Sequence, residues 1–262
     1  MTGEELWTWV ASVAGPVTDV RRLPGATSVD LYATDRVVVK HYVNTEWLAR
    51  EPDLAVREAA ALEVLAGSGV VAPRLVAVRD DVVVMTRLDG VHHWDPPRVE
   101  PLAEVALAIH AVGAPAGFRP YRRYVRDPVD PPVWSSRPAL WERAFEIAAN
   151  AVVDDARSCF IHRDHHAGNV LWSHGRVSGV VDWVEACVGP PAVDAARMRW
   201  NLVVHAGADA AARYARQPGV VVDPVWDVVD AIDSLWAHGP ATPHRDVLEA
   251  FVAASVSALD GH

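Results

Sequence analysis

The sequence predicts an α+β fold in which strands come early in the chain and helices make up most of the remainder. β-Branched runs at residues 37–43 and 82–86 lie on either side of a helical pattern at 54–66. After residue 89, apolar residues recur mainly at helical spacing, and short apolar runs flank residues 162–169. Because 51% of the 262 residues are hydrophobic, the chain can bury a sizeable core.

The early strands read as hairpins, which predicts an antiparallel sheet. Residues 22–32 form a strand pattern, a Pro-Gly turn and a second strand pattern. The run at 37–43 carries Lys40, the only lysine in the chain. Residues 72–78 and 82–86 read as two strands joined by a polar turn.

The helices follow from apolar spacing and from their stop signals. Residues 54–66 contain helix formers throughout, with apolar positions three and four residues apart and a glycine stop. Glu58 lies one turn into this helix. Further helices are predicted at 101–111, 138–153, 196–216, 223–236 and 244–258. Residues 113–138 are rich in Pro, Arg and Asp and read as a long irregular connection.

Three polar residues beside short apolar runs indicate chemistry on phosphates. Asp164 is followed by Asn169 five residues later, and Asp182 comes directly after a strand pattern at 177–181. In phosphoryl transfer, one carboxylate orients the accepting hydroxyl and takes its proton, while an amide oxygen and a second carboxylate hold magnesium. Short buried strands would hold the connecting loop rigidly at both ends.

The segment HRDHHAGN at 162–169 resembles the His-x-Asp-x-x-x-x-Asn catalytic loop of the kinase superfamily. It is similar to the His-Gly-Asp-x-His-x-x-Asn form of the aminoglycoside phosphotransferase family, with Arg163 in place of the common glycine. The segment GPPAVDAAR at 189–197 resembles that family's Gly-Asp-Pro-x-x-Asp-Leu-Ala, with Pro190 where aspartate is usual. In that pattern Asp194 would accept hydrogen bonds from backbone amides under the catalytic loop.

This resemblance implies a protein-kinase-like fold of two lobes. Residues 1–88 would form a nucleotide-binding lobe, an antiparallel sheet with one helix. Residues 89–262 would form a mainly helical lobe that carries catalysis and substrate binding. The length suits one such unit without a further domain.

The resemblance also implies roles for five residues. Asp164 would be the catalytic base, and Asn169 and Asp182 would be the magnesium ligands. Lys40 would hold the phosphates and Glu58 would pair with Lys40, although Glu58 also reads as a solvated helix charge. Arg163 would either contact the γ-phosphate or pair with a neighbouring acid.

Two further segments would bind the nucleotide. The amides and hydroxyls of Thr27 and Ser28 would donate to a phosphate, although a plain hairpin turn explains this segment equally well. The backbone of Thr86 and Leu88 would bond the adenine edge by resemblance to the kinase hinge, and an ordinary strand end is the alternative.

The substrate would meet the C-terminal helices. Asp227 and Asp230 follow Asp223 at four- and three-residue spacing and would form one acidic stripe that binds a cationic molecule. The alternative is a solvated helix face.

These features predict an ATP- and magnesium-dependent phosphotransferase that moves the γ-phosphate to a hydroxyl of a small molecule, with GTP as a possible donor. An aminoglycoside or another antibiotic is the first acceptor hypothesis. The alternatives are a metabolic small-alcohol kinase of the choline or homoserine type, and a nucleotide-binding regulatory protein with little turnover.

Composition limits the partners and the compartment. A net charge of −10 argues against nucleic acid, because phosphate contacts require clustered Lys and Arg, and it suits a cationic substrate. The predicted apolar helix at 101–111 is too short and interrupted to span a membrane, and no membrane partner is expected. The early acidic residues and the absence of a basic apolar leader predict no secretion signal, and the two cysteines lack motif spacing. We therefore expect a cytoplasmic protein.

Overall fold

The computed structural model describes residues 3–24, 28–96, 98–125, 130–239 and 242–261. Contacts within the chain define two units: Met1–Val91 with Val170–Ala186, and His92–Asn169 with Cys187–His262. The predicted lobe boundary after residue 88 stays a prediction. It differs from this division mainly because residues 170–186 group with the N-terminal strands. The two units are described separately below.

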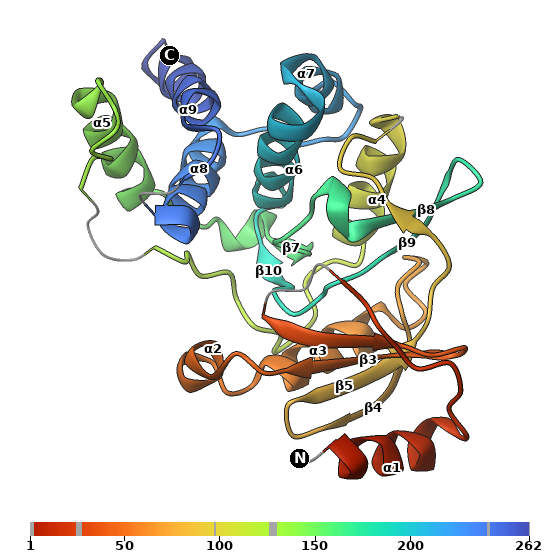
Figure 1. The fold of residues 1–262 in the computed structure, drawn as a ribbon. Helices are drawn as coiled ribbons and strands as arrows, with labels where there is room; N and C mark the ends of the chain where they lie inside the picture. Colours follow the sequence, from red (N-terminus) through yellow and green to blue (C-terminus); the bar gives the residue numbers. More distant parts are fainter. Residues whose placement is uncertain (1–2, 25–27, 97, 126–129, 240–241, 262) are drawn as a thin grey trace. The chain divides into compact units, whose positions relative to one another are not determined.

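A five-stranded antiparallel sheet in the order β1-β2-β3-β5-β4 forms the centre of the first unit (Figure 1). Its strands are β1 (Arg21–Arg22), β2 (Val29–Ala33), β3 (Val37–Tyr42), β4 (Leu75–Arg79) and β5 (Val82–Thr86). Lys40 pairs with Leu31 on one side and with Val83 on the other, so it lies in the central strand. The predicted antiparallel sheet is therefore confirmed.

Helices cover both faces of this sheet. Strand alternation sends Val37 and Val39 to one face, where they pack with Leu6 and Val10 of α1 (Gly3–Ala14). Lys40 and Tyr42 extend to the opposite face and bond to Glu58 of α3 (Leu54–Leu65). A short helix, α2 (Thr45–Arg50), begins at Asn44, whose side chain caps it. Neither α1 nor α2 is among the helices expected from the sequence.

A hairpin from later in the chain completes the first unit. Strands β8 (Val170–Ser173) and β9 (Arg176–Val180) pair antiparallel. Gly179 of β9 lies against the Leu88 side chain, so a Cβ atom at this position would collide with it. Packing against Leu88 therefore explains why β9 carries a glycine near its end.

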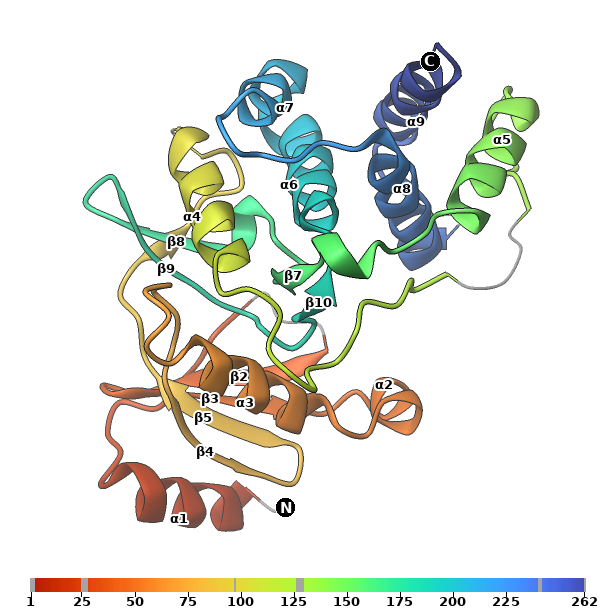
Figure 2. The same cartoon turned by 180° about the vertical axis from the view of Figure 1, so that it is seen from behind.

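The second unit is mainly helical (Figure 2). The chain enters it at β6 (Val91–His92). Its remaining elements are α4 (Glu100–His110), α5 (Pro138–Ala149), η1 (Asp155–Arg157), β7 (Cys159–Ile161), η2 (Ala167–Asn169), β10 (Cys187–Gly189), α6 (Pro191–Ala206), α7 (Ala208–Ala215), α8 (Pro224–His238) and α9 (Arg245–Asp260). Strands β7 and β10 pair antiparallel, and residues 162–169 lie between them in sequence.

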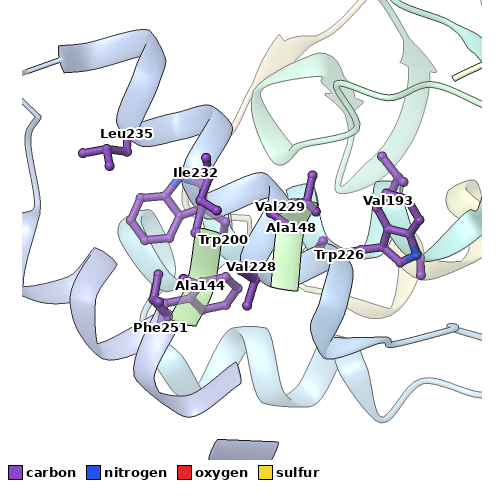
Figure 3. Packing of buried hydrophobic residues seen from close by; sticks show 14 of the residues in the cluster. Ala144, Ala148, Val193, Trp200, Trp226, Val228, Val229, Ile232, Leu235 and Phe251 are labelled. Carbon is purple, nitrogen blue, oxygen red and sulfur yellow. The ribbon is translucent and has the colours of Figure 1, made fainter. Parts of the chain in front are cut away.

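Large apolar side chains from α5, α6, α8 and α9 form the core of this unit (Figure 3). Val228, Val229 and Ile232 of α8 pack with Trp200 of α6 and Phe251 of α9. Burial of such side chains stabilises the unit by roughly 1.5–3 kcal/mol per residue. Helix α8 therefore carries both a buried apolar face and three aspartates, Asp227, Asp230 and Asp233.

One helix differs from its prediction. The expected helix at 196–216 is two helices, α6 and α7, separated at Gly207, whose φ is 87°. That angle lies in the left-handed region, where glycine interrupts a helix at little steric cost. Across the described residues, no helix is both long and apolar enough to cross a membrane.

Candidate active site

Lys40 is the centre of a charged cluster in the first unit. Its Nζ lies 3.0 Å from Oε2 of Glu58 and 2.6 Å from Oδ1 of Asp182. Glu58 comes from α3, and Asp182 follows β9 two residues after its end. Three segments far apart in sequence thus supply one ammonium and two carboxylates, and the pairing expected between Lys40 and Glu58 is present.

Glu58 is held by neutral groups as well. The Tyr42 hydroxyl donates to Glu58 Oε2 at 2.6 Å, and the backbone N–H of Trp183 donates to Oε1 at 3.2 Å. Glu58 is 1% exposed, so these bonds replace the water that its charge has lost. The alternative reading of Glu58 as a solvated surface charge is therefore wrong. We call Lys40, Tyr42, Glu58, Asp182 and Trp183 the lysine cluster.

The electrostatics of the lysine cluster favour ionised groups. Burial by itself would lower the pKa of Lys40, but Asp182 and then Glu58 outweigh it and raise that pKa well above its usual value. Burial and the charge of Glu58 raise the pKa of Tyr42, which remains a hydrogen-bond donor. Asp182 has a φ of 68°, a left-handed conformation that non-glycine residues adopt mainly where structure or function requires it.

The other residues predicted to bind nucleotide lie in the first unit or outside the described residues. Thr27 is one of the residues that the structure does not describe, and Ser28 lies just before β2. The backbone N–H of Thr86 donates to the Arg74 carbonyl at 2.8 Å, and its hydroxyl accepts from the Arg74 amide at 2.9 Å. The amide and the hydroxyl of Thr86 are therefore both used in contacts with Arg74.

Asp164 lies in the second unit, in a loop tied to helix α6. The backbone amides of His162 and Arg163 donate to the carboxylate of Asp194 at 3.0 and 2.6 Å. His110 also contacts Asp194, with Nε2 3.0 Å from Oδ2. Asp194 is fully buried, and its expected position under the loop is confirmed. Asp194 thus holds the backbone of residues 162–163, directly before Asp164.

The Asp164 carboxylate has three polar neighbours. Arg197 Nε donates to Oδ1 at 2.8 Å, Asn169 Nδ2 donates to Oδ2 at 3.3 Å, and His166 Nε2 lies 3.5 Å from Oδ2. Asn169 Nδ2 also donates to the Asp164 carbonyl at 3.0 Å. Burial would raise the pKa of Asp164, but Arg197 and His166 hold it well below its usual range. Asp164 is therefore ionised and oriented.

Arg163 is held by aromatic rings. Its guanidinium lies 3.6 Å from the ring centre of Tyr124 and 5.0 Å from that of Tyr121, and it donates to the carbonyl of Arg122. Its φ of 67° is in the region that the usual glycine would adopt freely. Stacking on two tyrosines compensates for the backbone cost of an arginine there. Its charge also lowers the pKa of Asp233, although burial raises that pKa to about 6.

The two adjacent histidines have different surroundings. His165 is buried beside the carbonyl of Leu102, and burial lowers its pKa to about 4. His166 stacks on the ring of Trp94, with centroids 4.9 Å apart and planes 16° apart. Trp94 also covers Gly168, where an added Cβ atom would lie 2.6 Å from the indole. The loop therefore requires a glycine at 168 because of this tryptophan.

The acidic stripe predicted on the C-terminal helix is mostly used within the protein. Asp223 caps α8 by accepting from the Val225 amide. Asp227 has a side chain 3% exposed and pairs with Arg199 of α6. Asp230 is 13% exposed, and its Oδ1 lies 3.7 Å from Arg197 Nη1. Its Oδ2 is buried and has no hydrogen-bond partner in the described part of the chain. Burial, and secondarily Asp233, raises the pKa of Asp230 to about 7, although Arg197 opposes this.

The two residues predicted to bind magnesium each fit a hard cation. Asn169 uses Nδ2 for Asp164, so its amide oxygen is the atom left to act as a ligand. The Asp182 side chain is 43% exposed while one of its oxygens contacts Lys40. No group of three or more His, Cys, Asp or Glu side chains among the described residues is arranged to hold a metal.

Sequence patterns did not identify several of these contacts. Arg197 contacts Asp164, Tyr42 contacts Glu58, and Trp94 stacks on His166. The sequence analysis gives none of the three a role, although Arg197 ends the segment at 189–197 and Tyr42 lies in the run at 37–43. For Arg197 one signal exists, since it lies three residues after Asp194 on the same helix.

Comparison with known proteins places this geometry in a family. A family model described as "Phosphotransferase enzyme family" matches residues 19–238. No curated protein matches the chain. Several solved structures do match, and they span its whole length.

A thermostable mutant of aminoglycoside phosphotransferase APH(4)-Ia, in complex with ADP and hygromycin B, is 19% identical with a TM-score of 0.72, over 97% of this chain and 98% of that one. Spectinomycin phosphotransferase APH(9)-Ia, with ADP and spectinomycin, is 14% identical with a TM-score of 0.61, over 100% and 99%. The streptomycin-ATP-APH(2")-IIa complex is 13% identical with a TM-score of 0.57, over 98% and 97%.

These similarities show that the fold is that of the aminoglycoside phosphotransferases, as the catalytic motif predicts. Because the family model covers most of the sequence, the chain belongs to the phosphotransferase enzyme family.

Proposed function

We propose that this phosphotransferase moves the γ-phosphate of ATP to a hydroxyl of an aminoglycoside or another antibiotic. The observation that carries the proposal is the state of Asp164. It is ionised, it receives a hydrogen bond from Asn169, and its loop is fixed by Asp194. An oriented carboxylate of this kind is what a hydroxyl acceptor requires in phosphoryl transfer.

Asp164 acts as the base in this mechanism. Its carboxylate accepts a hydrogen bond from the acceptor hydroxyl and directs the oxygen at the γ-phosphorus. The new oxygen–phosphorus bond forms as the bond from the γ-phosphorus to the bridging oxygen breaks, and ADP leaves. The hydroxyl proton passes to Asp164, whose low pKa suits a transition state in which that transfer comes late.

The nucleotide contacts come from the first unit. Lys40 binds phosphate oxygens, and Glu58 holds Lys40 in place through the ion pair at 3.0 Å. Ser28 donates to the phosphates, the expected donation by Thr27 falls outside the described residues, and the backbone of Thr86 and Leu88 bonds the base. Asn169 and Asp182 would provide oxygen ligands for magnesium, which would neutralise phosphate charge when bound. GTP is the alternative donor.

A cationic acceptor is supported by the charge of the protein and by Asp230. The net charge is −10, and Asp230 Oδ2 has no hydrogen-bond partner among the described residues. Hygromycin B, spectinomycin and streptomycin are the ligands named with the similar structures. Both carboxylates lie near an arginine, but Asp227 is 3% exposed and closely paired with Arg199, whereas Asp230 is 13% exposed and lies 3.7 Å from Arg197. We therefore propose the substrate contact at Asp230. An ATP-dependent reaction and two free cysteines suit the cytoplasm.

The test measures ADP release by the purified protein with ATP and magnesium. The acceptors are aminoglycosides, other antibiotics, choline, homoserine and sugars. We expect release that depends on an antibiotic and falls by roughly 10²–10⁴ in Asp164→Asn. ADP release with choline or homoserine alone would identify the protein as a metabolic small-alcohol kinase instead. A complete lack of acceptor-dependent release would refute the proposal.

A matched pair of variants tests the substrate carboxylate. Asp230→Asn should raise KM for a cationic antibiotic and leave KM for ATP unchanged. Asp227→Asn is the control on the same helix, and it should leave both KM values unchanged because Asp227 pairs with Arg199. Equal effects of both variants on the antibiotic KM would contradict the assignment.

A further inference from the structure

We propose that Arg197 is a positioning residue, which holds Oδ1 of Asp164 and thereby reserves Oδ2 for the acceptor hydroxyl. This inference rests on the proposed function, in which Asp164 is the base. Neither the family motif nor the sequence pattern assigns a role to Arg197. Its contacts lie wholly within the second unit.

The two oxygens of Asp164 are held unequally. Oδ1 accepts from Arg197 Nε at 2.8 Å, a normal charge-assisted hydrogen bond. Oδ2 has contacts of 3.3 Å to Asn169 and 3.5 Å to His166, both at or beyond the long end of the hydrogen-bond range. One oxygen is therefore fixed, and the other is the better acceptor for a further donor.

Arg197 is itself held from the opposite side. Its Nη1 lies 3.7 Å from Asp230 Oδ1 and 3.5 Å from the Ser234 hydroxyl, both on α8. The guanidinium is planar and its nitrogens form a rigid fork. These contacts of Nη1 are longer than the Nε bond to Asp164, and the carboxylate of Asp230 beside Nη1 favours the orientation in which Nε points toward Asp164.

Helix α6 thus holds the loop at two levels. Asp194, in its first turn, accepts the backbone amides of His162 and Arg163. Arg197, one turn later, holds the side chain of the next residue, Asp164. The spacing of three residues places both on the same side of the helix. Backbone and side chain of the loop are consequently positioned by one rigid element.

A second arginine on the same helix provides a matched comparison. Arg199 pairs with Asp227, so it also joins α6 to α8 through an ion pair. Within the described part of the chain, Arg199 forms no hydrogen bond or ion pair with Asp164, and its guanidinium lies 5.7 Å from the ring centre of Phe251. Loss of either arginine removes an interhelical ion pair, but only loss of Arg197 frees Oδ1 of Asp164.

The experiment compares Arg197→Gln, Arg197→Lys and Arg199→Gln with the wild-type enzyme, using steady-state kinetics with ATP and the best antibiotic acceptor. We expect Arg197→Gln to lower kcat by roughly 10–100-fold, because small misplacement of a reacting group has effects of that size. KM for ATP should stay within about twofold. Arg197→Lys should recover part of kcat, since it keeps the charge but loses the fork.

Thermal unfolding of each variant separates positioning from stability. Arg199→Gln should lower the melting temperature about as much as Arg197→Gln and keep kcat near wild type. Where Arg197→Gln does not fold, Arg197→Lys carries the test, and wild-type kcat in that variant would overturn the inference. An equal fall of kcat in Arg199→Gln would also overturn it.

A double variant separates this inference from the proposed function. In the Asp164→Asn background, Arg197→Gln should change kcat little, because there is no base left to position. If Asp164→Asn retains wild-type turnover, the proposed function fails. If Asp164→Asn is impaired and Arg197→Gln is not, the role of Arg197 alone is refuted.

Discussion

Nζ of Lys40 lies 2.6 Å from Oδ1 of Asp182, so a strand residue early in the chain pairs with a carboxylate 142 residues later. The same ammonium contacts Glu58 on α3. One cation therefore joins the two carboxylates that the proposed mechanism gives different tasks. Glu58 is buried and holds the lysine, whereas Asp182 is partly exposed and accessible to a metal ion.

Glu58→Gln should weaken both nucleotide binding and the fold of the first unit. Glu58 bonds Lys40, Tyr42 and the Trp183 amide, and glutamine retains only part of this set. We expect about 1–3 kcal/mol less stability and about tenfold weaker ATP binding. Glu63→Gln, on the exposed side of the same helix, is the control. Calorimetric titration and urea unfolding measure both effects, and equal losses in the control would contradict this view.

Asp182→Ala should abolish most of the benefit that magnesium gives to ATP binding. The substitution removes a proposed oxygen ligand and also releases Lys40 from its shortest ion pair. ATP affinity without magnesium should therefore fall little, or rise. Titrations with and without the metal show the difference. Asp35→Ala, at an exposed turn position, should keep the wild-type metal dependence. Equal metal dependence in Asp182→Ala and wild type would exclude Asp182 as a ligand.

The buried His165 should make the protein less stable in weak acid. Burial lowers its pKa to about 4 in the folded state, whereas an unfolded histidine titrates near 6.5. At this histidine the unfolded chain therefore takes up a proton first as pH falls, so the contribution of His165 to stability declines between pH 6.5 and 4. The raised pKa values of Asp230 and Asp233 act in the opposite direction, and the effect of His165 is measured as a difference between variants. The contribution is on the order of 3 kcal/mol.

Urea unfolding at several pH values in this range tests the role of His165. Relative to the wild type, His165→Leu should gain stability as the pH falls from 6.5 to 4. His174→Asn changes an exposed histidine in the β8–β9 turn and should leave the slope unchanged. The outcome against the prediction is a wild-type slope in His165→Leu.

Gly168→Ala should impair the catalytic loop through Trp94. The added methyl group would lie 2.6 Å from the indole, so either the ring or the loop beside Asn169 must move. We expect kcat to fall by about tenfold or more. Trp94→Ala in the same chain removes the obstacle and should restore part of the activity. A double variant as slow as Gly168→Ala alone would show that the indole is not the cause.

The sequence by itself determined the local chemistry of this protein. Asp164, Asn169 and Asp182 are recognisable because their spacing along the chain is set by one loop and one hairpin. Lys40 and Glu58 are recognisable because a β-branched run and a helical repeat identify their elements without any tertiary contact. The order of strands and helices follows from the same short-range patterns.

The tertiary structure alone decided which charges are balanced and by which partners. Arg197 reaches Asp164 over 33 residues, and Arg199 neutralises Asp227, so the acidic stripe of α8 is largely used between helices. Helix α1 was not predicted from the sequence, and it packs on the sheet through Leu6 and Val10. The physical reason is that helical spacing shows which residues share a face of α8. Helical spacing does not show which elements pack against that face. The desolvation of the aspartates and the charges beside them depend on those elements.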